Sequence, residues 1–258
     1  MKLTTLMENT AYLPGLTAEH GLSLFVEAAG RSFLFDTGAS GAFAGNAAAL
    51  GLDLGAAEFA ILSHGHYDHG GGLDRFLAIH PHAPVYASRF CFDDCRNATG
   101  KYIGLDPALQ SCGRLILTGD ECAISPGLTL YSCNGRPERA DPFGLTRREG
   151  DTLIPDDFRH EQYLLVEELG KRILLSGCSH KGILNLVDWF RPDILVGGFH
   201  FKSLSPHDPR LRRWGEILAA SGTVFYTGHC TGQEQFQVLK PILGDLLHAI
   251  STGSVLEL

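Results

Sequence analysis

The stretch Ser63-His64-Gly65-His66-Tyr67-Asp68-His69 decides the interpretation of this sequence, because it places three imidazoles and a carboxylate within six residues. It directly follows residues 59–62, an apolar run that predicts a short buried strand. Neutral imidazole nitrogens combined with one anionic oxygen suit zinc, manganese or iron. His64 and His66 project to the same side of an extended segment, whereas Asp68 and His69 begin the next turn and face a second position. The loop therefore predicts a site at a strand end that can supply ligands to two metal ions.

Short apolar runs alternate with helical patterns on both sides of this loop. Upstream, residues 22–27 and 31–35 predict a hairpin, and downstream residues 162–167 and 171–176 predict another. Further strands are expected at 194–196 and 224–226, and helices at 73–79, 183–190, 208–220 and 233–248. Residues 88–155 show little periodicity and predict an irregular insertion with short strands at 115–117 and 128–131. We therefore expect a mixed α/β chain that forms one domain over residues 1–258.

Composition narrows the class of protein. The 258 residues are 44% hydrophobic and 19% charged, which excludes a disordered chain. The net charge of −8 argues against a general binder of nucleic acid or anionic membranes. Seven cysteines without regular spacing do not form a disulfide framework, and no apolar run approaches the roughly 20 residues of a membrane helix. We expect a soluble cytoplasmic protein that acts on a small molecule, without a nucleic-acid or membrane partner.

The His-x-His-x-Asp-His loop after a buried strand resembles the hallmark of the metallo-β-lactamase superfamily. Leu34-Phe35-Asp36-Thr37-Gly38 is similar to the strand and turn that precede that loop in the superfamily. His180 and His229 lie at later expected strand ends and match its downstream ligands. The resemblance implies an α/β (α+β) fold, an αββα sandwich, with metal ions at the edge between its two sheets.

The resemblance also implies a ligand set for one or two divalent ions, with zinc first and manganese or iron as alternatives. The first ion would be held by His64, His66 and His180, and the second by Asp68, His69 and His229. The superfamily usually adds a bridging carboxylate, but here the expected strand end leads into Cys178 and supplies no Asp. Cys178 is interpreted as a buried structural cysteine, with a thiolate ligand as the alternative. Asp36 is expected to orient the ligand loop rather than to bind metal.

Candidate catalytic and substrate-binding residues lie close to these ligands. Asp68 and His200 are expected to take part in catalysis, since a double glycine before His200 lets the backbone approach the site. Lys181 and Lys202 flank site histidines and are candidates for neutralising a substrate phosphate, with ordinary exposed lysines as the alternative. Phe199 is a candidate for stacking on a flat ring.

Two histidines, His160 and His20, lie outside the motifs described above. His160 precedes an expected strand and is interpreted as a surface histidine, with a rival metal ligand as the alternative. His20 has no matching context and is expected to be solvent-facing or structural.

Three further motifs resemble one branch of the superfamily. They are Ser176-Gly177-Cys178-Ser179-His180-Lys181-Gly182-Ile183-Leu184-Asn185, Gly197-Gly198-Phe199-His200 and Thr227-Gly228-His229-Cys230-Thr231-Gly232. Members of this branch resemble the 7,8-dihydropterin-6-methyl-4-(β-D-ribofuranosyl)aminobenzene-5′-phosphate synthase, which implies a transferase acting on a phosphorylated, pterin-like substrate. A metal-dependent hydrolase of a phosphodiester, lactone or thioester is the alternative, and a non-catalytic metal-binding module is the third hypothesis. We expect residues 89–151 and 199–207 to form the walls of the substrate pocket.

Overall fold

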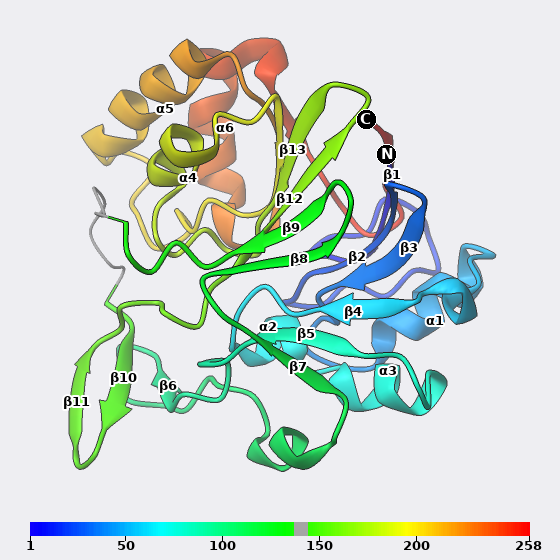
Figure 1. Ribbon diagram of the computed structural model, residues 1–258. Helices are drawn as coiled ribbons and strands as arrows, with labels where there is room; N and C mark the ends of the chain where they lie inside the picture. Colours follow the sequence, from blue (N-terminus) through cyan, green and yellow to red (C-terminus); the bar gives the residue numbers. More distant parts are fainter. Residues whose placement is uncertain (137–143) are drawn as a thin grey trace.

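Two seven-stranded sheets form the centre of the computed structural model, which describes residues 1–136 and 144–258 (Figure 1). In spatial order the first sheet contains β17 (Val255–Glu257), β1 (Lys2–Met7), β2 (Ser23–Ala28), β3 (Arg31–Phe35), β4 (Phe59–Ile61), β5 (Val85–Ser88) and β7 (Leu115–Thr118). The second contains β16 (Leu247–Ala249), β15 (Val224–Thr227), β14 (Ile194–Val196), β13 (Lys171–Leu175), β12 (Tyr163–Glu168), β9 (Leu128–Tyr131) and β8 (Glu121–Ser125). The first and last strands of the chain, β1 and β17, pair with each other, which brings the two termini together (Figure 1).

The two sheets share one hydrophobic core. Val26, Phe35 and Ile61 of the first sheet lie in the same buried cluster as Leu164 and Leu175 of the second. Side chains alternate between the two faces of a strand, so the inward-facing residues of both sheets meet in this cluster. Burial of apolar surface between the sheets therefore holds the sandwich together.

Helices cover the outer faces of both sheets (Figure 1). The first sheet packs against α1 (Ala42–Ala49) and α3 (Leu73–Ile79), and the second against α4 (Ile183–Phe190), α5 (Pro209–Ser221) and α6 (Gln233–Leu243). Shorter helical turns are α2 (Tyr67–Gly70), η1 (Leu54–Ala56), η2 (Pro107–Ser111), η3 (His229–Thr231) and η4 (Gly244–Leu246). The αββα sandwich predicted from the sequence is confirmed. No helix in the described ranges has the length and apolar character needed to cross a membrane.

Parallel pairing brings the candidate loops to one edge. Strand β4 is parallel to β3, and β14 is parallel to both β13 and β15. The carboxyl ends of parallel strands lie at the same edge of a sheet, which is where ligands bind in open α/β sheets. The segments that begin at Asp36, Ser63, Ser176, Gly197 and Gly228 all follow such strand ends. The topology therefore gathers residues from positions 36 to 229 at one place.

The stretch 88–155 is less irregular than predicted. Its strand β7 extends the first sheet, and β8 and β9 extend the second. The remainder includes a small three-stranded sheet of β6 (Cys95–Arg96), β10 (Thr146–Glu149) and β11 (Thr152–Pro155), which projects from the sandwich (Figure 1). Strands β7 and β8 lie at sheet edges and are half-exposed, whereas the strands expected at 115–117 and 128–131 are present as β7 and β9. Residues 137–143 of this stretch lie outside the described residues.

Candidate metal centre

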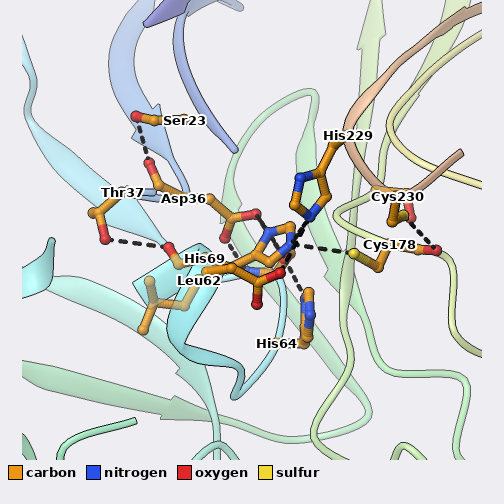
Figure 2. Close-up of polar contacts among 12 residues, drawn as sticks. Ser23, Asp36, Thr37, Leu62, His64, His69, Cys178, His229 and Cys230 are labelled. Carbon is orange, nitrogen blue, oxygen red and sulfur yellow. Dashed lines mark hydrogen bonds and ion pairs between the residues drawn. The ribbon is translucent and has the colours of Figure 1, made fainter. Parts of the chain in front are cut away.

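Two groups of donor atoms meet at the shared edge of the sheets. In the first group, His64 Nε2 lies 3.3 Å from His180 Nε2. In the second, His69 Nε2 lies 3.2 Å from His229 Nε2, and Asp68 Oδ2 lies 3.3 Å from the same His229 atom. Figure 2 shows the side chains of His64, His69 and His229 pointing toward a common centre. All five residues are buried.

Cys178 belongs to both groups. Its Sγ lies 3.2 Å from His69 Nε2, and its ligand atom is within 4.8 Å of the donor atoms of His64 and His180 as well (Figure 2). The sequence interpretation favoured a purely structural cysteine. A position between two sets of imidazoles fits the alternative, a thiolate ligand, better.

The spacing of these atoms fits a divalent metal ion. Ligands bound tetrahedrally to zinc at about 2.0–2.1 Å lie about 3.3 Å from one another. The contacts of 3.2 and 3.3 Å between His64 and His180, and between His69 and His229, match that separation. The donor set of imidazole, carboxylate and thiol is also one that zinc and iron accept. The residues present therefore fit one or two divalent ions.

His66 lies beside the first group. Its ring centroid is 4.6 Å from that of His64 and 4.8 Å from that of His180. His66 Nε2 and His180 Nδ1 are buried and have no hydrogen-bond partner within the described part of the chain. Buried polar groups are nearly always paired, so such atoms call for an explanation. A bound ion with its surrounding water provides one.

Asp36 fixes the orientation of His69. Its Oδ2 lies 2.6 Å from His69 Nδ1 and accepts a hydrogen bond of 2.7 Å from the Ser63 hydroxyl, while its Oδ1 accepts one of 2.7 Å from the Ser63 backbone N–H (Figure 2). Burial opposes protonation of His69, yet the Asp36 carboxylate raises the pKa of this imidazole. The proton is therefore held on Nδ1, and Nε2 is directed at the donor groups.

Burial prepares the other imidazoles as neutral ligands. It holds the pKa of His64 and of His180 well below the usual value, with neighbouring histidines adding to the effect. Burial also lowers the pKa of His66 to about 3, followed in size by the effect of His160. A neutral imidazole has a free lone pair for a metal. The electrostatics of the cluster therefore favour a bound cation over bound protons.

Comparison with known proteins identifies the family of the chain. A family model described as the metallo-β-lactamase superfamily matches residues 16–201. The chain belongs to the metallo-β-lactamase superfamily. Its metal-dependent members include hydrolases and related enzymes. The resemblance inferred from the sequence is thus confirmed.

Individual relatives extend the match over most of the chain. It is 27% identical over 236 residues to an uncharacterised protein of Methanocaldococcus jannaschii, covering 88% of this chain and 89% of the relative. It is 27% identical over 260 residues to the 7,8-dihydropterin-6-methyl-4-(β-D-ribofuranosyl)-aminobenzene-5′-phosphate synthase of the same organism, covering 90% and 88%. The crystal structure of Tm1679, described as a metal-dependent hydrolase of the β-lactamase superfamily, has 26% identity and a TM-score of 0.82, covering 100% and 99%.

His160 is not the surface residue that the sequence interpretation favoured. It is fully buried, its Nδ1 accepts a hydrogen bond of 3.2 Å from the Gly65 backbone N–H, and its Nε2 lies 3.3 Å from Asp156 Oδ2. Cys95, Asp156, His160 and His66 form a further buried group of donor atoms within 4.8 Å of one another. His160 thus lies behind the metal-binding loop of this superfamily member. The short turn that precedes β12 gave no sequence signal for this position.

His20 lies at the rim of the second donor group. Its Nε2 is 3.3 Å from Asp68 Oδ2, and its ring stacks on that of His229 with centroids 4.6 Å apart and an interplanar angle of 26°. Burial, followed by the effects of His229 and Lys202, lowers the pKa of His20 to about 4. The side chain is 39% exposed and stacks on His229, which agrees with the expectation of a solvent-facing or structural residue. No motif surrounds His20, and only the fold brings it to Asp68.

The substrate-binding candidates lie in three different environments. Phe199 is fully buried and packs against Phe225 with ring centroids 5.4 Å apart, so the expected ring stacking with substrate is wrong. Lys181 is also buried, and its Nζ donates 2.6 Å hydrogen bonds to the Ser132 carbonyl and to Asn134 Oδ1. It stabilises a turn and does not reach a substrate. Lys202 alone of these three is exposed.

His200 lies against the first donor group. Its ring centroid is 4.3 Å from that of His180, and the residue is buried with φ 58°. Burial, followed by the charge of Lys202, lowers the pKa of His200 to about 3. A neutral imidazole is therefore held next to the donors, where it can accept a hydrogen bond.

Proposed function

We propose that this chain is a metal-dependent hydrolase of a phosphorylated small molecule. The observation that carries the proposal is the arrangement of two donor groups that share Cys178, with 3.2–3.3 Å between neighbouring donor atoms. One ion would be held by His64, His66 and His180, and the other by Asp68, His69 and His229, with Cys178 between them. Zinc suits this mixture of ligands, with manganese or iron as alternatives. When bound, such ions supply Lewis acidity that polarises a phosphoryl or carbonyl group and acidifies water.

The surrounding residues have separate tasks in this proposal. Asp36 keeps the proton of His69 on Nδ1, so the ring presents Nε2. Asp68 remains an anion, because hydrogen bonding to His229 and the nearby His69 hold the pKa of its carboxyl well below the usual value, although burial opposes this. Asp68 therefore supplies a ligand rather than an acid. His200, neutral beside His180, is the candidate for contacting the substrate.

A second candidate function is the transfer reaction of the pterin branch. The 27% identity to the dihydropterin-ribofuranosyl-aminobenzene phosphate synthase over 90% of this chain supports it. Hydrolysis is preferred because Tm1679, which matches this chain over its full length with a TM-score of 0.82, is described as a metal-dependent hydrolase. Both candidate reactions would use the same metal ligands. They differ in the molecule that accepts the transferred group, which is water in hydrolysis and an aromatic amine in the transfer reaction.

The proposal is tested with protein purified without chelators. We expect near-stoichiometric zinc, manganese or iron by mass spectrometry, and turnover of a chromogenic phosphodiester or phosphomonoester. His66→Ala should reduce turnover by at least about 100-fold, because one donor of the first position is lost. His82→Ala serves as the matched control, since His82 is exposed. Bound metal with no turnover of any ester would favour a non-catalytic metal-binding module, and absence of bound metal would overturn the proposal.

A further inference from the structure

A cavity opens beside the second donor group. It has a volume of about 610 Å³, and His229 forms part of its wall. The other lining residues come from the loop after β1, from residues 227–234 and the first turns of α6, from residues 249–250 at the end of β16, and from Lys202. Small-molecule sites in proteins occupy roughly 300–1,000 Å³. The cavity is therefore large enough for a small substrate, and it adjoins the second donor group at His229, whose side chain is itself buried.

Lys202 places a positive charge at this cavity. It is the one lysine or arginine among the described lining residues. Its Nζ lies 2.8 Å from His20 Nε2, which in turn lies 3.3 Å from Asp68 Oδ2. The backbone N–H of Lys202 donates a 3.0 Å hydrogen bond to the Cys230 carbonyl, which anchors the base of the side chain. The ammonium group is thereby held close to the second donor group.

Two carboxylates, Glu8 and Glu234, also line the cavity, and no ion pair joins either of them to Lys202 in the described part of the chain. Glu8 is buried, and its Oε2 accepts hydrogen bonds of 2.8 and 2.9 Å from the backbone N–H and hydroxyl of Thr10. Its Oε1 accepts the backbone N–H of His229. Both oxygens are thus engaged in shaping the loop. Glu234, the other lining carboxylate, is exposed.

The rest of the lining contains both polar and apolar residues. Asn9 and Thr10 supply polar groups, and Asn9 also fixes the ring of His229, with 2.9 Å between its Oδ1 and His229 Nδ1. Phe236 and Ile250 supply apolar surface. A few polar groups on a mainly apolar wall are typical of sites for small organic ligands.

We propose that this cavity is the substrate subsite, in which Lys202 binds the phosphate or diphosphate group of the substrate beside the second donor group. The proposal rests on the proposed function and names its substrate class, a small phosphate or diphosphate ester. The non-reacting part of the substrate lies between Asn9 and Phe236. No described residue of the stretch 89–151 lines the cavity. Selectivity therefore resides in Lys202, the loop after β1 and α6 rather than in that stretch.

The test measures binding of inorganic phosphate and diphosphate to the metal-loaded full-length chain by titration calorimetry. Lys202→Ala should weaken binding of both anions about tenfold, because a charge-assisted contact is lost, with unchanged metal content. Lys202→Arg should restore most of the affinity. Lys171→Ala is the matched control, since Lys171 is an exposed lysine at the start of β13.

A kinetic comparison separates this subsite from the reaction itself. Lys202→Ala should raise KM for a phosphate ester and have a much smaller effect on KM for a neutral carboxylic ester. If the variant binds both anions as tightly as the unmodified chain, the anion contacts the metal ions alone and the proposal is wrong. If both anions bind through Lys202 but no ester is hydrolysed, the subsite stands and the hydrolase function fails. If neutral lactones are hydrolysed while neither anion binds, the hydrolase stands and the subsite fails.

Discussion

Two carboxylate–histidine pairs flank the metal-binding loop, and they serve different purposes. In the Asp36–His69 pair, Nδ1 contacts the carboxylate at 2.6 Å, and Nε2 lies 3.2 Å from both Cys178 and His229. In the Asp156–His160 pair, Nε2 faces the carboxylate at 3.3 Å, and Nδ1 accepts the backbone N–H of Gly65. The first pair therefore points a free nitrogen at the metal centre, whereas the second supports the backbone that carries His64 and His66.

The difference between the pairs shows that residue type and pairing do not define a role by themselves. Both pairs are buried and both combine one Asp with one His. The pairs differ in what the ring nitrogen that does not contact the carboxylate faces. In His69 it faces Cys178 and His229, and in His160 it faces the Gly65 backbone N–H. Gly65 is also tightly enclosed, since a Cβ added there would collide with the Cys91 carbonyl oxygen. The loop is thus held from behind by residues of the stretch 88–155 and by His160.

The largest expected effect is on metal binding, and it should differ between the Asp36–His69 and Asp156–His160 pairs when the same Asp→Asn substitution is made in each. Asp36→Asn should weaken metal binding at the second position about 10–100-fold, because His69 loses the carboxylate that fixes its tautomer. Asp156→Asn should change metal affinity by less than about threefold, because both ring nitrogens of its partner His160 are engaged, one with Asp156 and the other with the Gly65 backbone N–H. Metal content after dialysis against graded chelator measures both. Equal losses in the two variants would contradict the distinction.

A second prediction concerns the thiol that faces the Asp36–His69 pair. Burial, followed by Cys230, raises the pKa of Cys178 well above its usual value, so the metal-free protein holds a protonated thiol at pH 6–8. Binding of an ion releases that proton, so apparent affinity should rise with pH, about tenfold per unit for one proton. Cys178→Ser should flatten this slope by one proton between pH 6 and 8.

The histidines with pKa values near 3 are already neutral in this range and add nothing to the slope. Cys91→Ser is the control, because Cys91 is buried but belongs to none of the donor groups found among the described residues. An unchanged slope in Cys178→Ser would mean that the thiol does not bind the ion.

The smallest expected effect concerns the Asp156–His160 pair, which supports the backbone of the metal-binding loop. His160→Gln should leave both ions bound and lower the free energy of unfolding by about 1–2 kcal/mol, because the Gly65 N–H and Asp156 lose a buried partner. Urea denaturation of the metal-loaded protein measures the change. His80→Gln is the control, since His80 is a buried histidine at the end of α3. Loss of one ion per chain in His160→Gln would instead make His160 a ligand, the alternative that the sequence left open.

Local sequence patterns were sufficient for the fold and for most of the donor atoms. The apolar run before Ser63, the spacing of the histidines after it, and the strand ends before His180 and His229 are all readable within a few residues. Strand and helix periods, and the rule that parallel strands end at one edge, then bring these residues together. The αββα sandwich itself was implied by the resemblance of these motifs to the metallo-β-lactamase superfamily.

Tertiary structure alone decided what each remaining side chain faces. His160 contacts Gly65 across 95 positions of the chain, and His20 contacts Asp68 from a loop without any motif. Phe199 follows the double glycine near the site, yet its ring turns into the core against Phe225. Local spacing fixes the side of a strand or helix on which a residue lies, but its partners depend on how distant segments pack. For that reason the sequence determined the metal-binding loop of this protein, whereas packing decided which residues support it and which are buried away from it.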